Sequence, residues 1–171
     1  IIGAGTDEII IDGVEDLKGA VFSIPADRIE AGTYLIAAAL TGGNVTISNI
    51  EATRMNNILD KLTLSGASIK IGANNIELAM KGNKILPVDI STAPFPGFPT
   101  DMQAQFTVLN ALSNGSSVVT ENVFENRFMH VQELNRMGCD ITVKGSNAFV
   151  KGVSSLNGAP VMATDLRASA S

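Results

Sequence analysis

The chain repeats, near its two ends, the motif Gly13-Val14-Glu15-Asp16-Leu17-Lys18-Gly19-Ala20, whose second copy reads Gly152-Val153-Ser154-Ser155-Leu156-Asn157-Gly158-Ala159. Five of the eight positions are identical, including both glycines. Each copy leads to an aspartate that opens an apolar-periodic segment, Asp27 after the first and Asp165 after the second, and Asp101 opens a third such segment between them. Internal similarity of this kind predicts a repeated structural unit.

Similar elements recur after Asp27 and after Asp101. A helix pattern comes first, at residues 29–40 and 102–112. A Gly-containing turn and a short strand follow, with the strands predicted at residues 44–47 and 117–120. The first half of the unit is therefore predicted twice, about 70 residues apart.

The second half of the unit also occurs twice. A helix pattern begins after an arginine, at Met55 and at Phe128, and ends near Gly66 and Gly138, which are placed as residues that terminate helices. A strand pair then closes each unit. Its turns are predicted at Asn74-Asn75 and at Gly145-Ser146-Asn147. The sequence predicts an α/β fold of βαβαββ units, two nearly complete and a third begun, packed with approximate rotational symmetry.

The composition is that of a globular protein. The 171 residues suffice for one ordinary domain, and 45% hydrophobic with 17% charged residues excludes intrinsic disorder. Twelve basic against 17 acidic residues give a net charge of −5, which argues against a nucleic-acid partner or an anionic membrane surface. The longest apolar stretch, residues 34–40, is too short to span a bilayer. A single cysteine, Cys139, fits a reducing compartment, so we expect a cytoplasmic protein.

The two ends of the chain are informative. The first residue is Ile1, and no signal peptide follows it. The last residues, 164–171, have the pattern of the first turns of a helix without a stop signal. We therefore expect the chain to be cut from a longer one at both ends.

Asp101 is the strongest candidate for a residue that carries chemistry. An aspartate that opens a helix usually caps the backbone N–H groups, and this interpretation applies to all three aspartates. Asp101 differs because it follows the Pro- and Phe-rich run 92–99, and polar Gln103 and Gln105 come directly after it. A long aromatic loop that ends on a carboxylate is more typical of a binding wall than of a plain connection, so both interpretations stay open.

Two arginines are further candidates. Arg127 has a repeat partner in Arg54, which favours a structural role in the turn. The residues just before Arg127 are nevertheless richer in functional types than those before Arg54. An arginine beside a helix start can bind phosphate or carboxylate, and Arg167, two residues after Asp165, has the same potential.

The remaining reactive side chains are predicted to be structural. His130 is the only histidine and lies inside a helix pattern, so it is expected to be a packing residue. Cys139 occupies the position of Ala67 in the first unit, which predicts a small core residue and not a nucleophile. The sequence has no phosphate-binding glycine loop, nucleophile elbow or zinc motif, and we expect neither a metal nor a cofactor.

Four segments closely resemble the UDP-N-acetylglucosamine 1-carboxyvinyltransferase family, the enolpyruvyl transferases that open bacterial peptidoglycan synthesis. The most specific segment is Thr92-Ala93-Pro94-Phe95-Pro96-Gly97-Phe98-Pro99-Thr100-Asp101-Met102-Gln103-Ala104-Gln105-Phe106. The others are residues 25–33, 120–131 and 163–171, so the resemblance covers almost the whole chain. Long matches without gaps, in unusual sequence, are not produced by a shared fold alone.

The resemblance implies an inside-out α/β barrel of βαβαββ units, with residues 1–171 forming a single enolpyruvyl transferase domain truncated at both ends. A second domain would be missing. The implied reaction moves the enolpyruvyl group of phosphoenolpyruvate to the 3-hydroxyl of UDP-N-acetylglucosamine by addition and elimination, and releases phosphate. The implied partners are these two substrates and the second domain, with no nucleic acid, membrane or cofactor.

The resemblance also implies roles for seven residues. Asp101 falls on the family's general base toward the sugar hydroxyl. Because a carboxylate is a weak base, it would depend on close positioning in a closed site. The implied substrate-binding residues, of which the last three would line the enolpyruvate and phosphate side, are Asp101, Thr100, Val123, Phe124, Arg127, Asp165 and Arg167.

Other parts of the family pattern have no match here. The cysteine loop, a Lys-Asn pair and further phosphate-binding arginines are missing, and Cys139 does not fall on the catalytic cysteine. We therefore expect the isolated chain to bind substrate weakly and to be inactive. The alternatives are a noncatalytic scaffold of the same fold, favoured by the symmetric aspartates, and a 5-enolpyruvylshikimate-3-phosphate synthase, disfavoured by the segments around Asp101 and Arg127.

Overall fold

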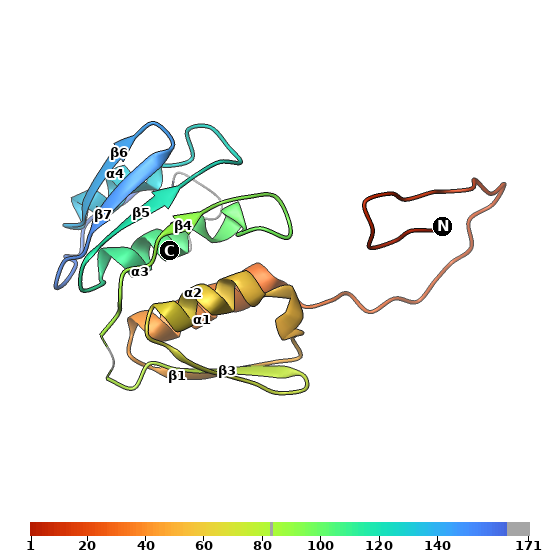
Figure 1. The fold of residues 1–171 in the computed structure, drawn as a ribbon, viewed down its shortest axis with the longest axis horizontal. Helices are drawn as coiled ribbons and strands as arrows, with labels where there is room; N and C mark the ends of the chain where they lie inside the picture. Colours follow the sequence, from red (N-terminus) through yellow and green to blue (C-terminus); the bar gives the residue numbers. More distant parts are fainter. Residues whose placement is uncertain (83, 164–171) are drawn as a thin grey trace.

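The structure is a computed structural model that describes residues 1–82 and 84–163. In this part of the chain, helices and strands extend from Arg28 to Lys151 and form two stacked α/β units (Figure 1). Asp165 and Arg167 lie outside the described residues, and so does most of the predicted third unit.

The first unit has the element order αβαββ. Its sheet has the order β1-β3-β2, and both pairings are antiparallel. Ahead of its first helix the described residues form no strand, in contrast to the predicted βαβαββ order. Its elements are α1 (Arg28–Leu40), β1 (Asn44–Ser48), the 3-10 helix η1 (Ala52–Arg54), α2 (Asn56–Leu64), β2 (Ser68–Ile71) and β3 (Asn75–Ala79).

The second unit has the full predicted order. Its sheet runs β4-β5-β7-β6, with β4 parallel to β5 and the other pairs antiparallel. The opening strand β4 is therefore held by β5. The elements are β4 (Ile90–Ser91), the 3-10 helix η2 (Thr100–Met102), α3 (Gln103–Ala111), β5 (Ser116–Thr120), α4 (His130–Arg136), β6 (Asp140–Lys144) and β7 (Asn147–Lys151).

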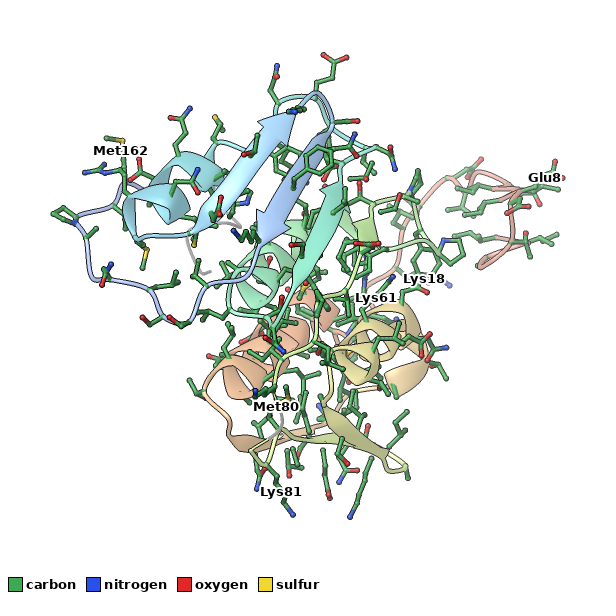
Figure 2. The ribbon with its side chains drawn as sticks, turned by 60° about the vertical axis from the view of Figure 1, so that its left-hand side comes forward. Glu8, Lys18, Lys61, Met80, Lys81 and Met162 are labelled. Carbon is green, nitrogen blue, oxygen red and sulfur yellow. The ribbon has the colours of Figure 1, made fainter. Side chains whose placement is uncertain are left out.

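Residues 1–27 extend away from the two units (Figures 1 and 2, where Glu8 marks this segment). Apart from a bridge between Ile2 and Ile10, the segment has no strand pairing. Val21 and Phe22 are 105% and 81% exposed, so the strand expected here does not form, since an apolar strand needs a partner that covers it. The prediction that residues 1–171 form one domain stays a prediction.

The motif that repeats in sequence has two different environments. A Cβ added at Gly152 would lie 1.8 Å from the carbonyl oxygen of Ser113, whereas at Gly13 it would meet nothing within 4 Å. Gly152 also donates its N–H to the carbonyl of Gly115. The second copy is therefore packed against the fold, and only this copy needs its first glycine for a close backbone approach.

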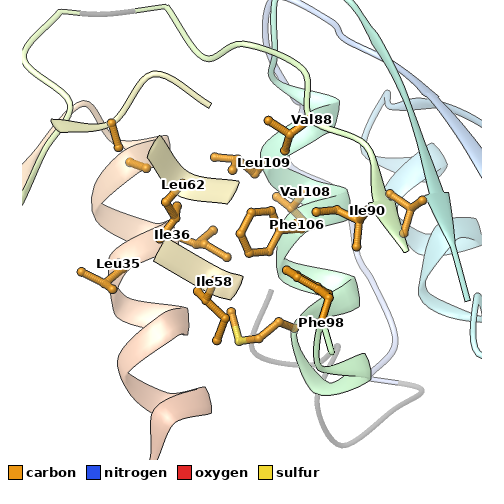
Figure 3. Packing of buried hydrophobic residues seen from close by; sticks show 14 of the residues in the cluster. Leu35, Ile36, Ile58, Leu62, Val88, Ile90, Phe98, Phe106, Val108 and Leu109 are labelled. Atoms are coloured by element: carbon orange, nitrogen blue, oxygen red, sulfur yellow. The ribbon is translucent and has the colours of Figure 1, made fainter. Parts of the chain in front are cut away.

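Helices α1, α2 and α3 lie between the two sheets, and α4 lies beside β6 (Figure 1). The buried cluster joins α1 and α2 of the first unit to α3 of the second, and Figure 3 shows Ile36 and Leu62 facing Phe106 and Leu109. Gly32 allows the close approach, because a Cβ there would lie 2.9 Å from the Met102 side chain. Helices inside and sheets outside are the arrangement of an inside-out α/β barrel, as predicted.

The helix ends follow the sequence signals. Asp27 caps α1, and its Oδ1 accepts hydrogen bonds from the N–H groups of Ile29 at 2.7 Å and Glu30 at 3.3 Å. Gly66 and Gly138 follow the C-caps of α2 and α4 with φ of 100° and 97°. Both hairpin turns end one residue earlier than predicted, because Asn75 and Asn147 are already the first residues of β3 and β7.

Replacing Asp27 by alanine is expected to lower the free energy of unfolding by about 1 kcal/mol, since the first turn of α1 loses its side-chain acceptor. Asp27→Asn keeps an acceptor oxygen and should be close to the original chain. Urea denaturation of the three proteins measures both differences. Equal losses in the two variants would contradict the capping role.

Candidate functional site

Asp101 is not the N-cap residue of its helix. It lies inside η2, at the entrance to α3, and Pro99 at the N-cap position gives no side-chain hydrogen bond. Its Oδ1 instead lies 3.2 Å from Nη2 of Arg127, which belongs to a loop 26 residues further along the chain. Of the two open interpretations of Asp101, this geometry favours a role in a site, whereas Asp27 is a plain cap.

Arg127 contacts three side chains among residues 1–82 and 84–163. Besides the pair with Asp101, its Nη1 donates to Oγ1 of Thr100 at 2.8 Å, and its guanidinium lies 5.0 Å from the ring centre of Phe124. The side chain is 18% exposed. Its repeat partner Arg54 pairs only locally with Glu51, and both of those side chains are more than half exposed. A purely structural role in the turn therefore fits Arg54. Arg127 is instead held by two residues of η2.

Val123 and Phe124 lie on the loop between β5 and α4. Val123 is half-buried and Phe124 is 56% exposed. A hollow of about 410 Å³ opens here, lined by residues 121–128 together with Gly145 and Ser146. The structure therefore brings five predicted site residues to one loop cluster and the start of η2. Thr100, Asp101, Phe124 and Arg127 are linked by the contacts above, and Val123 is the chain neighbour of Phe124.

Glu121 is a buried residue of this cluster that the sequence analysis did not single out. It is 3% exposed, and its carboxylate accepts hydrogen bonds from Thr92, Thr100 and the backbone N–H groups of Val123 and Phe124. A signal was present, because Thr92 and Glu121 directly follow β4 and β5. These strands are parallel, so their carboxyl ends place the two residues side by side.

The Pro- and Phe-rich loop is only partly the binding wall that we expected. Phe98 is 6% exposed and packs edge-on against Phe106 with ring centres 5.2 Å apart, so it belongs to the core. Phe95 is 77% exposed and lies under the guanidinium of Arg28 at 5.9 Å. Gln103 and Gln105, expected beside the site, are buried in α3.

His130 and Cys139 are buried, as predicted for packing residues. Burial raises the pKa of the Cys139 thiol, which makes it a poor nucleophile. Within residues 1–82 and 84–163, no group of three or more histidine, cysteine, aspartate or glutamate side chains could hold a metal ion. None of the helices in these ranges combines the length and apolar character needed to cross a bilayer.

This arrangement has two chemical capacities. The Asp101 carboxylate is one-third exposed and is paired with Arg127, which lines the hollow, so it can accept a proton from a hydroxyl group bound there. A guanidinium held in a fixed plane can contact a substrate anion or orient that carboxylate. The Asp101 carboxylate comes from the 3-10 helix η2, and the Arg127 guanidinium comes from the loop between β5 and α4. The candidate site is therefore formed by this helix and this loop together.

Comparison with known proteins places this geometry in a context. The family model described as EPSP synthase (3-phosphoshikimate 1-carboxyvinyltransferase) matches residues 1–171. The UDP-N-acetylglucosamine 1-carboxyvinyltransferase of Coxiella burnetii (strain Dugway 5J108-111) is 58% identical over 170 residues, which are 99% of this chain and 39% of that protein. The protein of the same name from Vesicomyosocius okutanii is 56% identical, over all of this chain and 41% of its own length. The chain thus spans about two fifths of these relatives.

Two solved structures are similar in fold. The enolpyruvyl transferase NikO from Streptomyces tendae has a TM-score of 0.74 and 26% identity, and the match covers 86% of this chain and 35% of that one. EPSP synthase from Acinetobacter baumannii has a TM-score of 0.55 and 18% identity, over 75% of this chain and 30% of that one. The second likeness concerns the fold alone.

Proposed function

The chain belongs to the EPSP synthase family, and from this premise we propose that it is part of an enzyme that makes UDP-N-acetylglucosamine enolpyruvate. The enzyme transfers the enolpyruvyl group of phosphoenolpyruvate to the 3-hydroxyl of UDP-N-acetylglucosamine. The sugar oxygen adds to C2 of the enolpyruvyl group while C3 takes up a proton, and loss of phosphate from C2 with a proton from C3 then restores the double bond. The identity of 58% to a protein named for this reaction carries the choice of acceptor.

In this proposal Asp101 takes the proton of the sugar 3-hydroxyl. Its partial exposure and its ion pair with Arg127, which lines the 410 Å³ hollow, support the role. Val123 and Phe124 contact the sugar nucleotide, with Thr100 beside them. Arg127 holds the carboxylate and contacts the anionic substrates. Arg127 is suited to this by its two hydrogen bonds and the aromatic ring beside it. Asp165 and Arg167 complete the phosphate side.

The chain is proposed to need a partner domain. Residues 1–171 correspond to about two fifths of the relatives' length, and the cysteine loop expected in this family has no match in them. We therefore place residues 1–171 in one domain, truncated at both ends, whose second domain closes on the substrates. The enzyme acts in the cytoplasm on the first committed step of peptidoglycan synthesis.

Phosphate release by the full-length protein tests the proposal. With phosphoenolpyruvate and UDP-N-acetylglucosamine we expect turnover, and with phosphoenolpyruvate and shikimate 3-phosphate none. The 171-residue chain alone is the matched control and is expected to release no phosphate. Turnover with shikimate 3-phosphate only would mean that this compound, and not UDP-N-acetylglucosamine, is the acceptor. Turnover with neither acceptor would favour the noncatalytic scaffold.

A further inference from the structure

Glu121 is a buried carboxylate to which neither the sequence nor the proposed reaction assigns a role. It directly follows β5 and is 3% exposed. Two hydroxyl groups and two backbone N–H groups donate hydrogen bonds to it. Because every partner donates, the position requires a group that only accepts, and a carboxylate is such a group.

One oxygen of Glu121 shapes the loop that lines the hollow. Its Oε1 accepts the N–H groups of Val123 at 2.9 Å and Phe124 at 3.1 Å, and the hydroxyl of Thr92 at 2.8 Å. Thr92 in turn accepts the N–H of Asn122 at 2.8 Å. The turn that carries Val123 and Phe124 is thus fixed to the end of β4.

The other oxygen acts on the Asp101–Arg127 pair. Oε2 accepts the hydroxyl of Thr100 at 2.8 Å, and that same hydroxyl oxygen accepts Nη1 of Arg127 at 2.8 Å. A hydroxyl group has one proton, so donating it to Glu121 leaves its lone pairs directed at Arg127. Nη2 of Arg127 then donates a hydrogen bond to Oδ1 of Asp101.

The first unit has no carboxylate at the position that corresponds to Glu121. Glu121 directly follows β5, and Asn49 directly follows β1 in the first unit. Each donates its N–H to the hairpin turn of its own unit, at the carbonyls of Ser146 and Asn74. Asn49 offers no carboxylate, and Arg54 pairs instead with the exposed Glu51. The difference between two arginines at the same place in the repeat therefore coincides with the presence of Glu121.

We infer that Glu121 is a positioning residue for the transfer reaction, an inference that rests on the proposed function. It holds the guanidinium of Arg127 against Asp101 through Thr100, and it fixes the turn at Val123 at the same time. Although Glu121 is among the residues that line the hollow, its carboxylate is almost fully buried and accepts hydrogen bonds from its neighbours, so its effect passes through these partners.

Glu121→Gln in the full-length protein is the first test. The amide oxygen can still accept from Val123 and Phe124, but the amide nitrogen would face the Thr100 hydroxyl with a donor. We expect kcat to fall roughly 10- to 100-fold, because small misplacements of a reacting group have such effects. The KM for UDP-N-acetylglucosamine should change less than about threefold, because the Val123 turn is kept. The exposed carboxylate of Glu77 on β3 gives the matched control, Glu77→Gln, with unchanged kinetics.

Variants of Thr100 separate positioning from a merely structural role. Thr100→Val removes the linking hydroxyl and should lower kcat to a similar extent, while Thr100→Ser keeps the hydroxyl and should restore it. The double variant Glu121→Gln/Thr100→Val should lose no more than either single variant, since both interrupt one path. Additive losses, or a Glu121→Gln enzyme with unchanged kcat and KM, would overturn the inference.

A structural readout keeps this inference distinct from the proposed reaction. If the full-length protein releases no phosphate with either acceptor, the proposed function fails. Crystal structures of Glu121→Gln and Thr100→Val then test the positioning itself, and we expect the guanidinium of Arg127 to move away from Asp101. An arginine that keeps its 3.2 Å contact in both variants would show that Glu121 does not position it.

Discussion

Asp101→Asn in the full-length protein is expected to lower the rate of phosphate release with UDP-N-acetylglucosamine by about 10²- to 10⁴-fold, the range that a general base contributes. Asparagine has nearly the same shape, and its amide oxygen can still accept the hydrogen bond from Arg127. The variant therefore removes the proton acceptor and keeps the contact. Steady-state kinetics with both substrates saturating measures the loss, which should appear in kcat.

The control for this variant is Asp60→Asn. Asp60 is an exposed carboxylate on α2, so its loss should leave kcat unchanged. If Asp101→Asn were as active as the original enzyme, Asp101 would serve only as a partner of Arg127. If the variant lost activity but Arg127→Lys lost none, the carboxylate would act without the fixed guanidinium.

The local features of the fold could be predicted from the sequence. The Asp27 cap, the helix after it, and the helix-ending Gly66 and Gly138 depend on a few neighbouring residues, and each was found near its predicted place. The repeat gave the order of elements in the second unit for the same reason. Helix caps and hairpin turns are short-range interactions, so one stretch of sequence contains all that they require.

The opening strand of the first unit was predicted only from the βαβαββ order, and it does not form in the described residues. The side chains of Val21, Phe22 and Ile24, ahead of α1, are exposed. In the second unit the equivalent strand β4 exists through its pairing with β5. A strand is defined by its partner, and a sequence pattern cannot supply one.

The candidate site shows a similar division. Asp101 and Arg127 could each be found as unusual members of their repeat positions, but their contact joins two loops and is visible only in the fold. Glu121 was missed because a glutamate after a strand is usually solvated. Its burial depends on Thr92 and Thr100, which come from other elements.

Phe106→Ala is expected to lower the free energy of unfolding by about 3–5 kcal/mol, a large part of the 5–15 kcal/mol typical of a domain. Phe106 is 0% exposed and lies between the helices of the two units (Figure 3). It also makes the edge-on contact with Phe98 at 82° between the ring planes, which adds to the loss. Urea denaturation of the 171-residue chain and its variant measures the difference.

Phe95→Ala is the matched control, since it removes the same atoms from a loop of the same unit. Phe95 is 77% exposed, so its removal should change the free energy of unfolding by less than about 0.5 kcal/mol. Similar losses in the two variants would mean that the helix-to-helix core does not hold the units together. Because Phe106 lies on α3, five residues after Asp101, a loosened core should also disturb the site. We therefore expect Phe106→Ala to weaken activity even at temperatures where the protein stays folded, whereas Phe95→Ala should not.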